Sequence, residues 1–223
     1  MKRYINMDDI SDGKLYTGES IVKAGCHGCE GCHLCCTGMG QSIILQPLDI
    51  HRLSAGLHKT FEELVGTYIE LRMADGLILP NLIMQPENDS CSFLDTYGRC
   101  KIHPFRPTFC RLFPLGIYYD DDGLHYFLQT KECPVPSKTK VRVRQWLEED
   151  NMAAYEAYTL RWHDFLEDCR TLLDSLNDEN RRLLCTYILQ FFYMTPYGND
   201  FYTIFNERIQ KVSLVLDAFR QEA

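Results

Sequence analysis

The sequence predicts an α+β fold in which a small irregular sheet with loops is followed by a C-terminal helical bundle. Nine of the eleven cysteines lie between positions 26 and 133, which sets the first part of the 223-residue chain apart from the rest. Residues 76–133 alternate strand-like runs with turn signals, whereas apolar residues beyond position 140 recur at helical spacing. With 45% apolar residues, a chain of this length can bury a core without staples.

The first 75 residues are predicted to form an arm and two short helices. Residues 1–25 are polar with scattered apolar side chains, which is typical of a loosely tied arm with a short strand or turn. Pro47 suits the start of a helix that ends near Gly56. Thr60 and Glu63 have the spacing of a capping box. This box predicts a second helix, whose inner face carries Leu64, Tyr68 and Leu71.

Strands and turns are predicted between residues 76 and 133. The run GLILPNLIMQ (76–85) contains proline and therefore predicts a bulged or edge strand. The run LGIYYDDDGLHYFLQT (115–130) predicts a hairpin that turns at Asp122-Gly123. Between these runs we expect a turn at Tyr97-Gly98, and three X-Pro steps predict extended, irregular backbone over residues 103–114.

Three helices are predicted after a linker at residues 134–140. The second is capped by Asn177, and the third runs from Phe205 to Phe219. The first has an apolar seam that consists of Tyr155, Tyr158, Trp162, Phe165, Cys169 and Leu172. We therefore expect three parts, an N-terminal arm (1–23), a cysteine-cluster domain (24–136) and a C-terminal helical region (137–223).

Charge and composition argue against several partners. The formal net charge is −8 and the pI is near 5.4, whereas nucleic acid and anionic membranes bind basic surfaces. No run of roughly 18 apolar residues predicts a membrane span. The opening residues MKRYINMDDISDGK lack the apolar segment of a signal peptide. A cytoplasmic location is therefore expected, where thiols stay reduced or bind metal.

The cysteines of the run CHGCEGCHLCC (26–36) have the spacing of metal ligands. Cysteine recurs at every third position from 26 to 35, and Cys36 follows directly. Two intervening residues let both sulfurs converge on one centre, as in zinc ribbons, ferredoxins and dithiol redox sites. An iron–sulfur cluster accepts three ligands from such a loop and a fourth from a distant cysteine before proline, for which Cys133 is a candidate. The spacing favours an iron–sulfur centre, with zinc as the alternative.

Other roles for these cysteines fit less well. Disulfides need an oxidising compartment, and thioredoxin-like chemistry needs an isolated Cys-x-x-Cys at the start of a helix. Cys169 and Cys185 lie on or beside apolar helical seams and are expected to pack in the core. Cys26 is left open between ligand and bystander. Three histidines lie close enough in sequence to substitute as ligands, namely His27, His33 and His103.

Four segments of the chain carry a recognisable pattern: CEGCHLCC (29–36), CSFLD (91–95), GRCKIHPFRPTFCRLFP (98–114) and ECP (132–134). Together they resemble the YkgJ-type cysteine-cluster family, which is named for a C-x2-C-x2-CC motif and described as chelating zinc or iron. The resemblance covers residues 24–136. Flagellin lysine N-methylases, with which an iron–sulfur centre is associated, are similar in their cysteine motif. The metal ligands that the resemblance implies are Cys29, Cys32, Cys35, Cys36, Cys91, Cys100, Cys110 and Cys133.

Basic residues gather around Cys100 and Cys110 in an otherwise acidic chain. They are expected to donate hydrogen bonds to sulfur or to bind an anion. At an open iron position, Arg106 or Arg111 could pair with the carboxylate of a cofactor such as S-adenosylmethionine. The full basic set is Arg99, Lys101, Arg106 and Arg111.

Three functions follow from these patterns. The first is an iron–sulfur protein with redox or S-adenosylmethionine-dependent, methylase-like activity, although no Gly-rich loop follows a strand. The second is a structural zinc module whose helical region binds a protein partner. The third is a metal storage or delivery protein.

Overall fold

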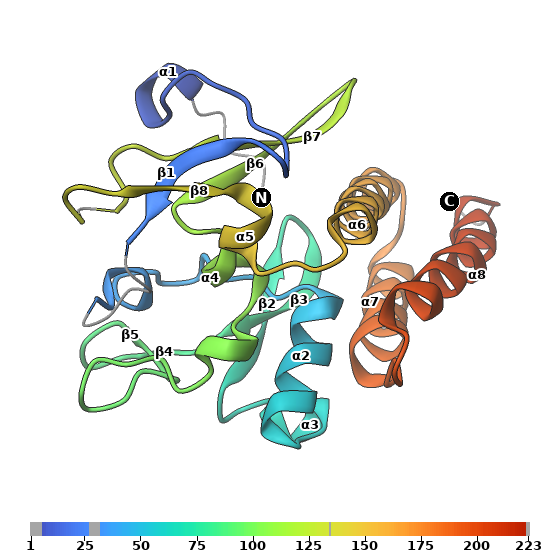
Figure 1. Cartoon of the computed structure of the whole chain (residues 1–223). Coiled ribbons are helices and arrows are strands. Elements are labelled where there is room, and N and C mark those ends of the chain that lie inside the picture. Colours follow the sequence, from blue (N-terminus) through green and yellow to red (C-terminus); the bar gives the residue numbers. More distant parts are fainter. Residues whose placement is uncertain (1–5, 27–31, 134, 222–223) are drawn as a thin grey trace.

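Paired strands occupy the first part of the chain and long helices the last part (Figure 1). The computed structural model describes residues 6–26, 32–133 and 135–221. In Figure 1 the strands gather on one side and helices α6, α7 and α8 on the other, with α2 between them. This arrangement confirms the predicted α+β class and the C-terminal helices.

The described helices are short before residue 150 and mostly long after it. The short ones are α1 (Met7–Ile10), η2 (Leu34–Cys36), α2 (Pro47–Leu57), α3 (Phe61–Leu64), η3 (His103–Phe105), α4 (Thr108–Leu112) and α5 (Val143–Leu147). The C-terminal ones are α6 (Met152–Leu173), α7 (Asp178–Ile188), its π-helical continuation η4 (Leu189–Met194) and α8 (Phe201–Gln221). Asn177 caps α7 as predicted, because its Oδ1 accepts the Asn180 N–H at 2.9 Å. Within the described ranges, no helix has both the length and the apolar character to cross a membrane.

The strands form separate two-stranded antiparallel ribbons. These pair β1 (Ile21–Gly25) with β8 (Thr139–Arg142), β2 (Ile69–Ala74) with β3 (Leu77–Leu82), β4 (Met84–Gln85) with β5 (Ser90–Cys91), and β6 (Leu115–Asp120) with β7 (Gly123–Leu128). The predicted β6–β7 hairpin is confirmed, and the strand that contains Pro80 lies in such a ribbon. The β1–β8 pairing joins residues on both sides of the expected domain boundaries at 23 and 136.

The helix that begins after Thr60 is shorter than predicted. Its capping box forms, with the Glu63 N–H donating to the Thr60 hydroxyl at 3.3 Å, but α3 ends at Leu64. Gly66 then takes a φ of +81°, which glycine adopts without strain, and the chain enters β2. The prediction that Tyr68 and Leu71 line a helix is wrong, because Ile69–Ala74 pairs with β3 and leaves Leu71 42% exposed.

Aromatic side chains of α6, η4 and α8 form the helical core. Trp162 of α6 lies against Phe192 of η4, with ring centroids 5.1 Å apart. A hydrogen bond joins this core to the first part of the chain, because the Leu48 N–H of α2 donates to the Tyr158 hydroxyl at 3.1 Å. The helical region therefore braces α2, which in turn holds the cysteine-bearing segment described next.

Candidate metal centre

Five cysteine thiols from separate segments of the chain come together on the strand side. A β-bridge between Thr37 and Ser90 places η2 beside β5, and the Gly38 N–H donates to the Asp89 carbonyl at 2.8 Å. A second bridge, between Leu94 and Cys100, brings Cys100 back beside the segment that follows Cys91. The five thiols belong to Cys35 and Cys36 of η2, Cys91 of β5, Cys100, and Cys110 of α4. We call them the thiol cluster.

The members of the thiol cluster influence one another's pKa. A hydrogen bond from the Cys36 thiol lowers the pKa of Cys35 to about 7, and the same bond raises the pKa of Cys36. Burial, followed by the negative charge of neighbouring cysteines, raises the pKa of Cys91 to about 11. Burial, followed by the negative charge of Cys35, Cys91 and Cys100, raises the pKa of Cys110. Thiolates gathered in this way need a cation to compensate them.

Asp49 fixes the position of the helix that carries Cys110. This carboxylate is fully buried in the first turn of α2. Its Oδ1 accepts the Thr108 N–H at 2.6 Å and the Thr108 hydroxyl at 2.7 Å, while its Oδ2 accepts the Gln46 N–H at 2.8 Å. The short helix α4 therefore has its first residue anchored to α2. Sequence reasoning missed both Asp49 and α4, because residues 103–114 were expected to be irregular.

The two arginines singled out in the sequence have different surroundings. Arg111 is buried and donates to the carbonyls of Pro104, Arg106 and Leu147 at 2.5, 3.0 and 3.3 Å, and to the Glu148 carboxylate at 2.9 Å. Its guanidinium thus ties the proline-rich turn to α5.

Arg106, in contrast, acts on the thiol cluster through its charge. Its positive charge helps to lower the pKa of Cys35 and opposes the rise in that of Cys100. Its guanidinium also contacts the His103 carbonyl at 2.9 Å and lies 3.4 Å from the Glu148 carboxylate. Arg106 therefore supplies positive charge beside the sulfurs, and Arg111 holds the backbone of Arg106 in place.

Four cysteines line a small cavity, and one of them, Cys35, also belongs to the thiol cluster. Its volume is about 20 Å³. The cysteines that line it are Cys26, Cys32, Cys35 and Cys133, and its apolar walls include Leu34, Phe113 and Trp146. Cys29, which the resemblance also implies as a ligand, lies outside the described residues. Cys169 and Cys185 are buried in the helical region, and burial is the main cause that raises the pKa of Cys169.

The donor set suits a soft metal. Thiolates select zinc, copper(I) and iron–sulfur clusters over magnesium or calcium. In residues 6–26, 32–133 and 135–221, no three His, Cys, Asp or Glu side chains already have the arrangement that holds a metal ion. The thiols would therefore have to draw together as they bind one.

A comparison with protein families finds one that matches residues 28–142, which is more than half of the chain. That family carries the name CxxCxxCC and the description "Putative zinc- or iron-chelating domain". The chain belongs to this CxxCxxCC family. Membership supports metal binding, with zinc or iron as the metal. Cys26 precedes the matched range. Neither a search of curated proteins nor one of solved structures found a match.

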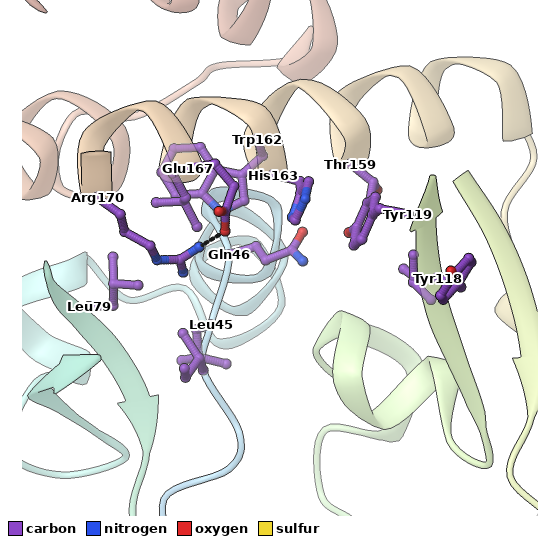
Figure 2. Close-up of a pocket in the computed structure, with 13 residues that line it drawn as sticks. Leu45, Gln46, Leu79, Tyr118, Tyr119, Thr159, Trp162, His163, Glu167 and Arg170 are labelled. Atoms are coloured by element: carbon purple, nitrogen blue, oxygen red, sulfur yellow. Dashed lines mark hydrogen bonds and ion pairs between the residues drawn. The ribbon is translucent and has the colours of Figure 1, made fainter. Parts of the chain in front are cut away.

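Two adjoining cavities lie between the cysteine region and α6. The first cavity has a volume of about 480 Å³ and lies beneath α6. Figure 2 shows Glu167 and Arg170 reaching from this helix into the cavity, on the side of Gln46. At its other end Tyr119 stacks on His163, with ring centroids 3.7 Å apart. A second cavity of about 510 Å³ shares Gln46 and continues to residues that neighbour the cysteines, namely Gly38, Phe109 and Glu132. Sequence reasoning missed these cavities, because their walls come from segments far apart in the chain.

In metal-free protein at pH 7, Cys35 is expected to react with iodoacetamide faster than Cys91. The thiolate is the reactive form, and the lowered pKa of Cys35 leaves about half of it ionised, whereas the pKa of Cys91 leaves almost none. Peptide mass spectrometry after brief labelling measures the ratio. Equal labelling of the two cysteines would contradict the electrostatics described above.

Proposed function

We propose that this protein holds an iron–sulfur cluster through cysteines of the thiol cluster. One observation carries the proposal: the Thr37–Ser90 and Leu94–Cys100 bridges bring distant cysteine-bearing segments side by side. The positive charge of Arg106 acts on cysteines of both segments. The three-residue repeat of the 26–36 loop is the spacing from which such clusters take several ligands. Cys29, Cys32 and Cys133 complete the proposed metal-binding set, and a reducing compartment, the cytoplasm, keeps all these thiols available.

We further propose that the cluster serves redox or S-adenosylmethionine-dependent, methylase-like chemistry. Arg106 is the residue that we expect to pair with a cofactor carboxylate, because its positive charge already acts on Cys35 and Cys100. Arg111 positions Arg106 through its backbone carbonyl. The cavity that reaches Gly38 and Phe109 provides space for a substrate next to the centre.

The test is the colour and composition of protein purified without oxygen. We expect a brown protein that contains iron and acid-labile sulfide and loses its visible absorption when the iron is reduced or chelated. Colourless protein with stoichiometric zinc would overturn the iron–sulfur proposal and favour a structural zinc module or a metal-delivery protein. Zinc modules use closed thiolate sites for stability alone.

A further inference from the structure

We propose that the two adjoining cavities near α6 form one groove, which binds a short, extended, basic segment of a partner protein as an added β-strand. The cavities share Ile44, Gln46 and Ile117 in their walls. We call the two together the edge groove, because an open strand edge borders it on each of two sides. The proposal goes beyond the proposed function and does not depend on which metal the thiols bind.

The first open edge belongs to β6. Tyr126 of β7 exchanges both of its backbone hydrogen bonds with Tyr16, at 2.8 Å each, so its N–H and C=O point away from β6. Ile117 of β6 lies opposite Tyr126, and the members of such a pair in an antiparallel ladder both point their backbone groups outward. Tyr119, two residues further on, has the same orientation. Among the described residues, these outward groups of Ile117 and Tyr119 have no hydrogen-bond partner.

This outer edge of β6 borders the edge groove. Ile117 and Tyr119 line the cavity of about 480 Å³, and Ile117 also lines the cavity of about 510 Å³. Gln129 lines the second cavity too, and its Nε2 donates to the outward carbonyl of Leu115 at 3.1 Å. The outward groups of Ile117 and Tyr119, which continue the edge beyond Leu115, are therefore available to a strand that lies in the groove.

The second open edge belongs to the segment that precedes α2. Ile44 bridges Asn81 of β3, and the two hydrogen bonds that flank this bridge, 2.9 and 3.0 Å long, are made by the neighbours of Ile44. The N–H and C=O of Ile44 therefore point away from β3, and they have no partner in the part of the chain that the structure describes. Figure 2 shows Leu45 and Gln46 of this segment on one side of the first cavity and Tyr119 on the other.

An extended peptide in the edge groove satisfies both edges. Unpaired N–H and C=O groups at a strand edge pair readily with another chain, and strand addition is a common mode of peptide recognition. Successive residues of a strand point their backbone groups to opposite sides, so one peptide bonds to β6 and to Ile44 with alternate residues. The added strand would join the β2–β3 and β6–β7 ribbons, which are separate in the structure, into one sheet.

The walls of the edge groove suit apolar side chains. Trp162 and Leu166 of α6 line one end of the groove, and Phe109 and Leu112 of α4 line the other. Side chains of a bound strand point alternately to its two faces. We therefore expect apolar residues in the middle of the peptide.

The charges of the edge groove favour a basic peptide. Besides His163, the ionisable acidic and basic side chains that line it among the described residues are Glu132, Glu167 and Arg170. The charge of Arg170 is already compensated, because it pairs with Glu167 and lies 3.4 Å from the Asp75 carboxylate. Glu132 is exposed at the end near the cysteines. Acids therefore outnumber bases, as they do in the whole chain with its net charge of −8.

Fluorescence anisotropy with labelled pentapeptides tests the proposal. The probes are blocked at both ends, carry lysine at the first and last positions, and vary the central residues among valine, isoleucine, leucine, phenylalanine, tyrosine and threonine. We expect Ile117→Pro to weaken the tightest binder about fivefold or more, because proline removes an N–H that the β6–β7 ladder does not use. Methylating the backbone nitrogens of alternate peptide residues should weaken it more than about tenfold.

Leu71→Pro is the matched control. Leu71 of β2 lies opposite Pro80, whose carbonyl bonds outside the ribbon, so the Leu71 N–H also points away from its ladder. The change is the same, but Leu71 does not line the edge groove, and the peptide should bind this variant as it binds the wild type. Probes with glutamate in place of lysine should bind more weakly than the lysine probes.

Several results would overturn the proposal. One is an array in which no lysine probe binds more tightly than about 1 mM. Another is equal binding of the methylated and unmethylated peptides, which needs no change in the protein and so decides even if Ile117→Pro fails to fold. Stronger binding of the glutamate probes would refute the basic character of the segment. A dimer of the free protein that the peptide separates would assign the edges to a second copy of the chain. Metal content, measured separately, decides the proposed function.

Discussion

Replacing Cys100 with serine is expected to release the metal held by the thiol cluster and to lower the stability of the strand side. A serine hydroxyl stays protonated at neutral pH and is a poor ligand for a soft metal. Loss of a residue that merely supports a ligand costs about 10–100-fold in affinity, so loss of a ligand should cost more than about 100-fold. Metal analysis after gel filtration and a thermal melt, with and without chelator, measure both effects.

Cys169→Ser is the matched control, because it makes the same chemical change at a buried cysteine of α6. We expect it to keep the wild-type metal content and to lower the melting temperature only through packing. Similar metal loss from both variants would contradict the division between ligand and core cysteines. Cys29→Ala, at a position that the sequence predicts to be a ligand, should lose metal as Cys100→Ser does.

Features that depend on neighbouring residues were predictable from the sequence. The Asn177 cap, the Pro47 start of α2 and the turn of the β6–β7 hairpin each depend on a few adjacent residues. The helix after Thr60 was overextended because Leu64, Tyr68 and Leu71 have helical spacing, while the competing pairing partner, β3, begins only at Leu77. A partner that distant leaves no local signal.

The candidate site follows the same rule. The spacing of the cysteines indicates a metal, because the repeat in residues 26–36 is local. The grouping of the cysteines is not local, since it depends on the Thr37–Ser90 bridge and on the β1–β8 ribbon. For the same reason the role of Asp49 has no sequence signal beyond its place in the first turn of α2. Its carboxylate accepts a hydrogen bond from Thr108, which is distant in the sequence.

Asp49→Asn is expected to destabilise the protein by about 2–3 kcal/mol and to weaken metal binding as well. The carboxylate accepts three hydrogen bonds with both oxygens. An asparagine keeps one oxygen, so its NH₂ group must face either the Gln46 N–H or the two Thr108 donors, and a buried donor loses its partner. Thr108 begins the helix that carries Cys110, so a shift there should move a sulfur.

Urea denaturation of metal-loaded and metal-free protein separates the two effects. Asp121→Asn, at the exposed tip of the β6–β7 hairpin, makes the same change where water replaces the lost acceptor, and we expect it to cost less than about 0.5 kcal/mol. If Asp49→Asn lowers stability equally in the loaded and metal-free forms, the carboxylate stabilises only the α2–α4 contact. A larger loss in the loaded form means that Asp49 also positions Cys110, because the free energy of metal binding then adds to that of folding. A metal affinity unchanged by Asp49→Asn would contradict this coupling.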